Sequence, residues 1–352
     1  MSRFLKEALV SLDAYIPGEQ PQDKKYIKLN TNESPYPPSK LVVERITEEE
    51  IEKLKLYSDP TCSRLKSKLA ALFGVEKENV FISNGSDEVL SFSFLTFCDG
   101  NKGMAFPDIS YGFYKVYAEL YGVPYERIPL RDDFSVAKED YFHLDKNIVI
   151  ANPNAPTGLA LSRTEVEEIV TKNDNLVIID EAYVDFGGES CIPLTKKYGN
   201  LLVVGTFSKS RSLAGARLGF AVGNKEIIAD LEKVKYSTNP YNINRISQIA
   251  GEAAIDDNGY YMANAARIIE TRDKTAGELK RLGFEVIPSK ANFIFAKHSE
   301  ISGAELYLKL KENGILVRHF SAPRIDAYLR ITVGTPEEMS TFVETVDRII
   351  GR

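Results

Sequence analysis

Cysteine is scarce in this sequence, and long apolar runs are absent. The three cysteines, Cys62, Cys98 and Cys191, are odd in number and far apart. Their number and spacing fit neither a disulfide framework nor a metal cluster and favour a reducing compartment. No stretch approaches the roughly 18 apolar residues of a membrane helix, and the start of the chain lacks the continuous apolar core of a signal peptide. We therefore expect a cytoplasmic protein that does not span or bind a membrane.

Blocks of lysine and arginine are also absent, and the formal net charge is -6. This charge pattern argues against a surface that binds nucleic acid or an anionic membrane. Any anionic ligand must therefore be bound by a few individually placed cations.

The common catalytic signatures are missing as well. The sequence contains no GxxxxGK(S/T) phosphate loop, no strand-linked GxGxxG and no GxSxG nucleophile turn. The three histidines, His143, His298 and His319, do not have the spacing of metal ligands. These absences argue against the usual hydrolases and metalloenzymes.

Near-continuous apolar segments such as NIVIA, NLVIID and NLLVVGTF alternate with helical patterns through the middle of the chain. This alternation predicts an α/β fold with a mostly parallel sheet covered by helices on both faces. A long helix is expected at about 245–281, and the mixed strands and helices after it predict a smaller α+β domain. The start is rich in Pro, Gly and Asn, which predicts an extended arm. We expect an arm at 1–30, a large domain at 31–244 and a small domain at 245–352.

Polar residues follow several of the predicted strands. Ser86, Asn154, Asp180 and Lys209 each come after the end of a different strand, and ligands of such sheets bind at that edge. The turn at Ser86 also begins a helix, whose exposed N–H groups suit a phosphate. The sequence therefore predicts that these four residues meet in one site.

Two of these residues indicate a particular cofactor. A lysine buried near other cations has a lowered pKa and can act through its neutral amine, and Lys209 has Arg217 near it in sequence. A carboxylate such as Asp180 keeps a pyridine nitrogen protonated, while Tyr183 could reach the ring hydroxyl and Ser208 the phosphate. An acid and a lysine at two strand ends are thus typical of a pyridoxal phosphate site. Taken singly, the lysine also fits a solvated turn, and the acid fits a helix cap or a surface charge.

A set of motifs spread over nearly the whole chain resembles the fold-type I, pyridoxal-phosphate-dependent aminotransferases, and most closely their histidinol-phosphate aminotransferase subfamily. The motifs are AYIPGEQ, LNTNESPYPP, YSDP, SNGSDE, PDISYGFY, NPNAPTG, IIDEAYVDF, TFSKSRSLAGARLGF, GILVRHF and YLRITVG. The resemblance implies an aspartate aminotransferase-like fold, pyridoxal 5'-phosphate as the cofactor and an obligate homodimer with shared sites.

The resemblance also implies roles for residues at the cofactor. It makes Lys209 the Schiff-base lysine and proton shuttle, Asp180 the partner of the pyridine nitrogen, and Tyr183 the donor to the ring hydroxyl. Tyr111 falls where the family stacks an aromatic ring on the cofactor, and Tyr57 where a tyrosine from the neighbouring subunit reaches the phosphate. The phosphate-side positions are Ser86 and Asp87, through their backbone, together with Ser208 and Arg217.

One position departs from the family pattern. Many relatives have an Asn directly before the second Pro of the NPNAPTG motif, and that Asn hydrogen-bonds the ring oxygen; this chain has Ala155 before Pro156. Either Tyr183 holds that oxygen alone, or Asn154 or a water replaces the missing side chain. We expect Asn154 to be a cofactor ligand and the pKa of the imine to be altered.

Substrate recognition is expected at Tyr15, Asn32, Arg318 and Arg330. The guanidinium of arginine suits carboxylate and phosphate oxygens. By resemblance, Arg330 holds the α-carboxylate of the amino donor, and Arg318 and Tyr15 hold the substrate phosphate. The implied reaction transfers an amino group from L-histidinol phosphate to 2-oxoglutarate, giving imidazole-acetol phosphate and glutamate in histidine biosynthesis. The alternatives are an aromatic amino-acid aminotransferase, a threonine-phosphate decarboxylase or, from another class, a non-catalytic regulatory protein that binds the cofactor.

Overall fold

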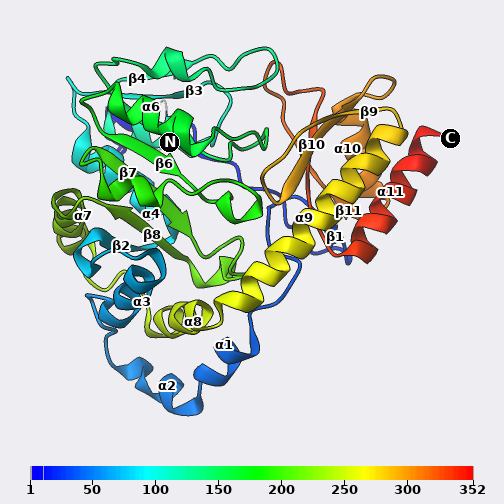
Figure 1. Ribbon diagram of the computed structural model, residues 1–352. Helices are drawn as coiled ribbons and strands as arrows, with labels where there is room; N and C mark the ends of the chain where they lie inside the picture. Colours follow the sequence, from blue (N-terminus) through cyan, green and yellow to red (C-terminus); the bar gives the residue numbers. More distant parts are fainter. Residues whose placement is uncertain (1, 11, 352) are drawn as a thin grey trace.

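The computed structural model describes residues 2–10 and 12–351 of the chain. Two sheets organise it, a larger one in the first two thirds of the chain and a smaller one near the C-terminus (Figure 1). Within the described residues, no helix is both long and apolar enough to cross a membrane.

The larger sheet has seven strands in the order β2-β8-β7-β6-β5-β3-β4. Its neighbouring strands run parallel except at β8, which is antiparallel to both β2 and β7. The strands are β2 (Val80–Asn84), β3 (Met104–Pro107), β4 (Tyr125–Ile128), β5 (Asn147–Ala151), β6 (Val177–Asp180), β7 (Leu201–Thr206) and β8 (Leu218–Gly223).

Helices cover both faces of this sheet, which is why β5, β6 and β7 are buried along their whole length. On one face, α4 (Gly85–Phe97), α5 (Phe113–Tyr121) and α7 (Lys225–Thr238) share a core with the strands. On the other face lie α6 (Arg163–Thr171) and, in a neighbouring core, α3 (Ser63–Phe73) and α8 (Arg245–Asp256). The predicted fold class is confirmed.

The smaller sheet is antiparallel, with the order β12-β13-β10-β9. Its strands are β9 (Phe284–Ile287), β10 (Phe293–His298), β12 (Arg318–His319) and β13 (Leu329–Thr332). It shares a core with α9 (Asn258–Arg281), α10 (Gly303–Glu312) and α11 (Pro336–Ile350). The short strand β1 (Ile27–Lys28) pairs with β11 (Ile315–Leu316), so the end of the predicted arm is joined to this smaller part.

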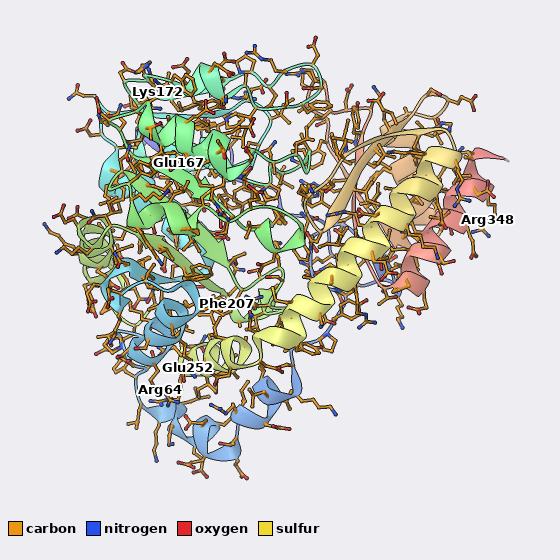
Figure 2. All side chains as sticks on the ribbon, viewed as in Figure 1. Arg64, Glu167, Lys172, Phe207, Glu252 and Arg348 are labelled. Atoms are coloured by element: carbon orange, nitrogen blue, oxygen red, sulfur yellow. The ribbon has the colours of Figure 1, made fainter. Side chains whose placement is uncertain are left out.

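The helix predicted at 245–281 is two helices, and that prediction is wrong as one continuous element. Asp257 separates α8 from α9. Helix α8 packs on α3 and on α1 (Lys40–Arg45), and Glu252 forms a 3.1 Å ion pair with Arg64 of α3 (Figure 2). Helix α9 instead runs across to the smaller sheet (Figure 1). The chain changes direction at Asp257: α8 packs in the core beside the large sheet, whereas most of the buried apolar residues of α9 belong to the core of the smaller sheet.

The division into an arm at 1–30 and domains at 31–244 and 245–352 stays a prediction. Two contacts bear on where its boundaries lie: α8 packs beside the large sheet, and β1 pairs within the small part.

Candidate active site

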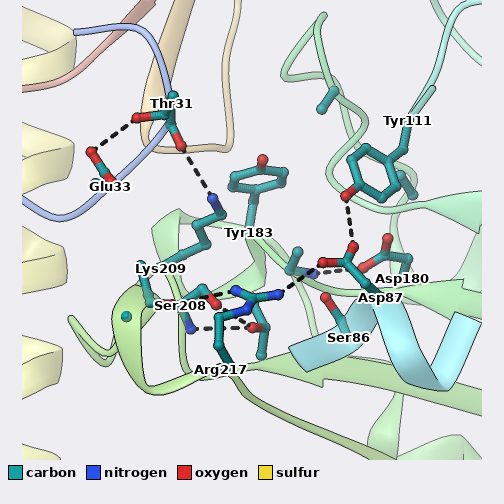
Figure 3. Close-up of a pocket in the computed structure, with 16 residues that line it drawn as sticks. Thr31, Glu33, Ser86, Asp87, Tyr111, Asp180, Tyr183, Ser208, Lys209 and Arg217 are labelled. Atoms are coloured by element: carbon teal, nitrogen blue, oxygen red, sulfur yellow. Dashed lines mark hydrogen bonds and ion pairs between the residues drawn. The ribbon is translucent and has the colours of Figure 1, made fainter. Parts of the chain in front are cut away.

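A cavity of about 330 Å³ lies at the carboxyl ends of β5, β6 and β7 (Figure 3). This is the edge at which a parallel sheet binds its ligands. Eight of the residues singled out from the sequence line it: Ser86, Asp87, Tyr111, Asp180, Tyr183, Ser208, Lys209 and Arg217.

Asp180 ends strand β6, and its side chain is buried. The hydroxyl of Tyr114 donates to its Oδ2 at 3.0 Å, and the backbone N–H of Ala182 donates to its Oδ1 at 3.2 Å. Burial raises the pKa of Asp180 to about 6, although these two hydrogen bonds act in the opposite direction. A cationic group placed against this carboxylate would be strongly favoured.

Two buried residues, Phe207 (labelled in Figure 2) and Ser208, separate Lys209 from the end of β7. Its Nζ donates to the carbonyl oxygen of Thr31 at 3.4 Å and lies 5.8 Å from the centre of the Tyr183 ring. Burial lowers the pKa of Lys209 to about 8, and the nearby positive charge of Arg330 adds to this effect. The amine is therefore readily made neutral, as a nucleophilic lysine requires.

The first turn of α4 forms one end of the cavity. Gly85 begins this helix with φ +75°, and within the described part of the chain the side chain of the N-cap residue, Asn84, makes no capping hydrogen bond. Strand β8 passes so closely that a Cβ on Gly219 would lie 2.3 Å from the backbone nitrogen of Ser86. The first N–H groups of a helix have no partner within it, so this turn can bind an anion.

A hydrogen-bonded trio lies next to that turn (Figure 3). Arg217 donates to Oδ2 of Asp87 at 2.9 Å, and the hydroxyl of Tyr111 donates to Oδ1 of the same carboxylate at 2.7 Å. Arg217 has a left-handed backbone with φ +53°. The Asp87 carboxylate therefore connects the guanidinium of Arg217 to the hydroxyl of Tyr111. Sequence reasoning missed both contacts.

Asn32 lies beside Tyr183. Its Nδ2 donates to the Tyr183 hydroxyl at 2.9 Å, and its Oδ1 accepts from Thr332 at 3.0 Å. Burial raises the pKa of Tyr183, which stays protonated at neutral pH. Since the amide of Asn32 is the donor in this pair, the tyrosine's own proton remains available to another acceptor.

A second cavity of about 760 Å³ adjoins the first and shares Tyr111, Tyr183 and Lys209 with it. All four predicted substrate residues, Tyr15, Asn32, Arg318 and Arg330, line this second cavity. Arg330 donates from Nη2 to the carbonyl oxygen of Asn30 at 3.1 Å, while its buried Nε has no hydrogen-bond partner among the residues that the structure describes. A buried guanidinium in this state is suited to an anionic ligand.

Two predicted residues do not line either cavity. Asn154 is buried in the turn after β5. Its Nδ2 donates to the carbonyl of Ile109, which follows β3, at 3.0 Å and to the hydroxyl of Thr157, in the same turn, at 3.1 Å. Tyr57 is 78% exposed and stacks on Tyr241, with ring centres 4.3 Å apart. In one subunit it is therefore a surface residue.

Sequence reasoning missed two further residues of the site, Tyr114 and Thr31. A signal for Tyr114 existed, because it lies three residues after Tyr111 and so on the same side of its helical turn. The contact of Thr31 with Lys209 uses only its backbone carbonyl, which no side-chain pattern could reveal.

Comparisons with known proteins place the chain in a family. The model of the class I and II aminotransferases matches residues 24–346. Histidinol-phosphate aminotransferase from Brachyspira hyodysenteriae is 53% identical over 352 residues, which cover 99% of each chain. The enzyme of the same name from Clostridium acetobutylicum is 49% identical, over 99% of this chain and 100% of that one.

Solved structures agree in fold. The histidinol-phosphate aminotransferase from Sinorhizobium meliloti, in complex with pyridoxal-5'-phosphate, superposes with a TM-score of 0.89 at 20% identity, over 99% of this chain and 98% of that one. The structure of the Clostridium acetobutylicum histidinol-phosphate aminotransferase gives 0.85 at 24% identity, over 92% and 98%. These two structures, at 24% and 20% identity, show the fold alone. The family is shown by the sequence matches. The chain belongs to the class I and II aminotransferases.

Proposed function

We propose that this aminotransferase uses pyridoxal 5'-phosphate to transfer an amino group from L-histidinol phosphate to 2-oxoglutarate in histidine biosynthesis. The names of the full-length relatives at 53% and 49% identity support this assignment. We further propose that it works in the cytoplasm as a homodimer.

The observation that carries the proposal is the pair of buried groups in one cavity. Asp180 is an acid that burial disfavours as an anion, and Lys209 is an amine that burial disfavours as a cation. A pyridine ring with a carbonyl substituent would suit both, since Asp180 would hold its protonated nitrogen and Lys209 would face its carbonyl. The donors at the α4 end, Ser208 and Arg217, suit the phosphate of such a ring.

The cofactor, when bound, supplies an electron sink for the charge that develops at the reacting carbon of the substrate. Asp180 holds the proton on the pyridine nitrogen, and Tyr183 donates its hydroxyl proton to the ring oxygen. Lys209 moves the proton at the substrate carbon through Nζ. Tyr111 packs on the ring, while Arg217 and Ser208 bind the phosphate together with the backbone of Ser86 and Asp87.

Asn32 supports Tyr183 in this role. Because Ala155 has no side-chain amide and the Asn154 amide hydrogens are used on Ile109 and Thr157, we assign the ring oxygen to Tyr183 alone. Asn32 orients the Tyr183 hydroxyl by donating to it.

The two substrates would make different contacts in the second cavity. Arg330 suits the α-carboxylate of glutamate, and Arg318 with Tyr15 suits the phosphate of histidinol phosphate. One set of cations can accept either anion, which the two half-reactions of a transaminase require.

The test is a comparison of amino donors with purified enzyme. L-histidinol phosphate, L-phenylalanine, L-tyrosine and L-threonine phosphate are each titrated while the absorbance of the bound cofactor is followed. We expect histidinol phosphate to bleach this absorbance at the lowest concentration. A preference for the aromatic acids would assign the enzyme to aromatic amino-acid transamination, and release of carbon dioxide from threonine phosphate would assign it to decarboxylation.

A further inference from the structure

The N-terminal arm reaches the substrate cavity through Tyr15, whose ring stacks on Phe113 at 4.2 Å between ring centres and is tilted against Tyr111 at 6.4 Å. Gly112 lies under this ring, because a Cβ there would be 3.5 Å from it. An aromatic contact alone is too weak to offset the backbone entropy lost when an arm becomes ordered. Other contacts must therefore keep Tyr15 in the cavity.

Glu19, four residues further along, makes such contacts with the smaller part of the molecule. Its two carboxylate oxygens accept from the hydroxyl of Tyr307 and from Nζ of Lys311, both on α10. These two residues are four apart, so they lie on one face of that helix. Burial alone would raise the pKa of Glu19, but the hydrogen bonds from Lys311 and Tyr307 bring it below the ordinary value, so the carboxylate is charged at neutral pH.

The backbone of the arm is also held at Glu19 and at the three residues before it. The carbonyl oxygen of Glu19 accepts from the amide of Asn30 at 2.8 Å. Arg318 donates to the carbonyl oxygens of Ile16 at 3.1 Å and Pro17 at 3.3 Å. A Cβ on Gly18 would come within 2.7 Å of the Thr31 side chain, which shows how closely the arm is packed at this point.

We propose that Glu19 is a positioning residue for the anionic end of the substrate: by binding α10 it holds Tyr15 and Arg318 in one arrangement around the phosphate. This inference rests on the proposed function, since it takes the phosphate of the amino donor as the group that Tyr15 and Arg318 bind. Glu19 itself does not touch the substrate. Between two amino donors that differ only in the phosphate, its effect therefore falls on the one that carries the phosphate.

The first test compares L-histidinol phosphate with L-histidinol, which has the same imidazole and amine but no phosphate. For each donor, the rate constant of the half-reaction is measured and divided by the apparent dissociation constant. The value for histidinol phosphate divided by the value for histidinol gives the contribution of the phosphate. Glu19→Gln lowers this ratio by about tenfold by acting on histidinol phosphate alone. The charge-swapped pair Glu19→Lys with Lys311→Glu recovers most of the loss.

Asp23→Asn is the matched control, because Asp23 is an acid of the same arm whose side chain accepts a hydrogen bond from its neighbour Tyr26, at 3.1 Å, and not from α10. A ratio near one in the wild-type enzyme would reject the proposed substrate. A high wild-type ratio that Glu19→Gln leaves unchanged would reject the role of Glu19 and leave the proposed substrate intact.

The second test uses the cofactor-free protein and the absence of tryptophan from the sequence. Ile16→Trp places a single tryptophan at an exposed arm position, 75% accessible, next to Tyr15. We expect Glu19→Gln to lower the fluorescence anisotropy of this tryptophan, and Asp23→Asn to leave it unchanged. Equal anisotropy with and without the Glu19 carboxylate would show that the arm is held by other contacts.

Discussion

The carboxyl group of Asp180 binds its proton more tightly in the folded protein than in the unfolded chain, because burial raises its pKa to about 6 from the ordinary 3.8. Its contribution to the stability of the cofactor-free protein is therefore complete below pH ~4 and is lost as the pH rises through about 6. Asp180→Asn cannot ionise and does not show this loss. The free energy of unfolding of the variant minus that of the wild type should therefore be larger at pH 8 than at pH 4, by on the order of 2 kcal/mol.

Urea unfolding of the cofactor-free proteins at the two pH values measures this difference. The exposed Asp174→Asn is the control, and its stability difference from the wild type should not depend on pH in this way. In parallel, Asp180→Asn should bind pyridoxal phosphate more weakly, because the charged partner of the ring nitrogen is gone. A stability difference for Asp180→Asn that is the same at both pH values would contradict the assignment of a raised pKa to this group.

Single residues differ in how far the sequence could predict them. Asp180 and Lys209 were predictable because each follows an apolar strand, and parallel strands bring their carboxyl ends together. The bond from Tyr114 to Asp180 joins residues 66 positions apart, and the bond from Asn32 to Tyr183 spans 151. Such pairs depend on how helices and strands pack, which local patterns do not encode. Asn154 follows a strand end as predicted but does not line the cavity, because its amide hydrogens are donated to Ile109, 45 positions away, and to Thr157.

At the level of elements, the site depends on how closely strand β8 approaches the first turn of α4. Gly219→Ala would place a Cβ 2.3 Å from the Gly85 carbonyl carbon and the Ser86 nitrogen, so backbone atoms must move. We expect the free energy of unfolding to fall by about 1–3 kcal/mol, as in overpacked cores. The affinity for pyridoxal phosphate should fall as well, because the shifted turn is the one proposed to bind its phosphate.

Equilibrium dialysis or fluorescence titration with the cofactor, together with urea unfolding, checks both effects. Gly277→Ala in α9 serves as the control, since its Cβ would meet open space and alanine favours a helix over glycine. Unchanged cofactor affinity in Gly219→Ala would mean that the α4 turn does not bind the phosphate.

The elements themselves were largely predictable because their apolar patterns match a buried parallel sheet. The order of the strands and the antiparallel direction of β8 were not predicted. The division of 245–281 into α8 and α9 was not predicted, although the residues Asp256 to Gly259 are typical of a turn. The two helices look alike in sequence, and the core on which each one packs becomes visible only in three dimensions.

On the scale of the whole molecule, the segment 43–57 exposes several large apolar side chains. Val43, Ile51, Leu54, Leu56 and Tyr57 are all exposed in the single chain. A group of exposed apolar residues of this kind marks a protein interaction surface. This supports the proposed homodimer, in which Tyr57 crosses to the phosphate in the partner's site.

Subunit mixing tests the shared site directly. Lys209→Ala should abolish turnover in its own site, and Tyr57→Ala should weaken cofactor binding in the partner's site. If Tyr57 crosses the interface, a mixed dimer of the two variants contains one site with both mutations and one site with neither. Random mixing of equal amounts should then restore activity to about one quarter of the wild-type level at limiting cofactor, since half of the dimers are mixed. If Tyr57 serves its own subunit, every site in the mixture carries one mutation, and mixing restores nothing.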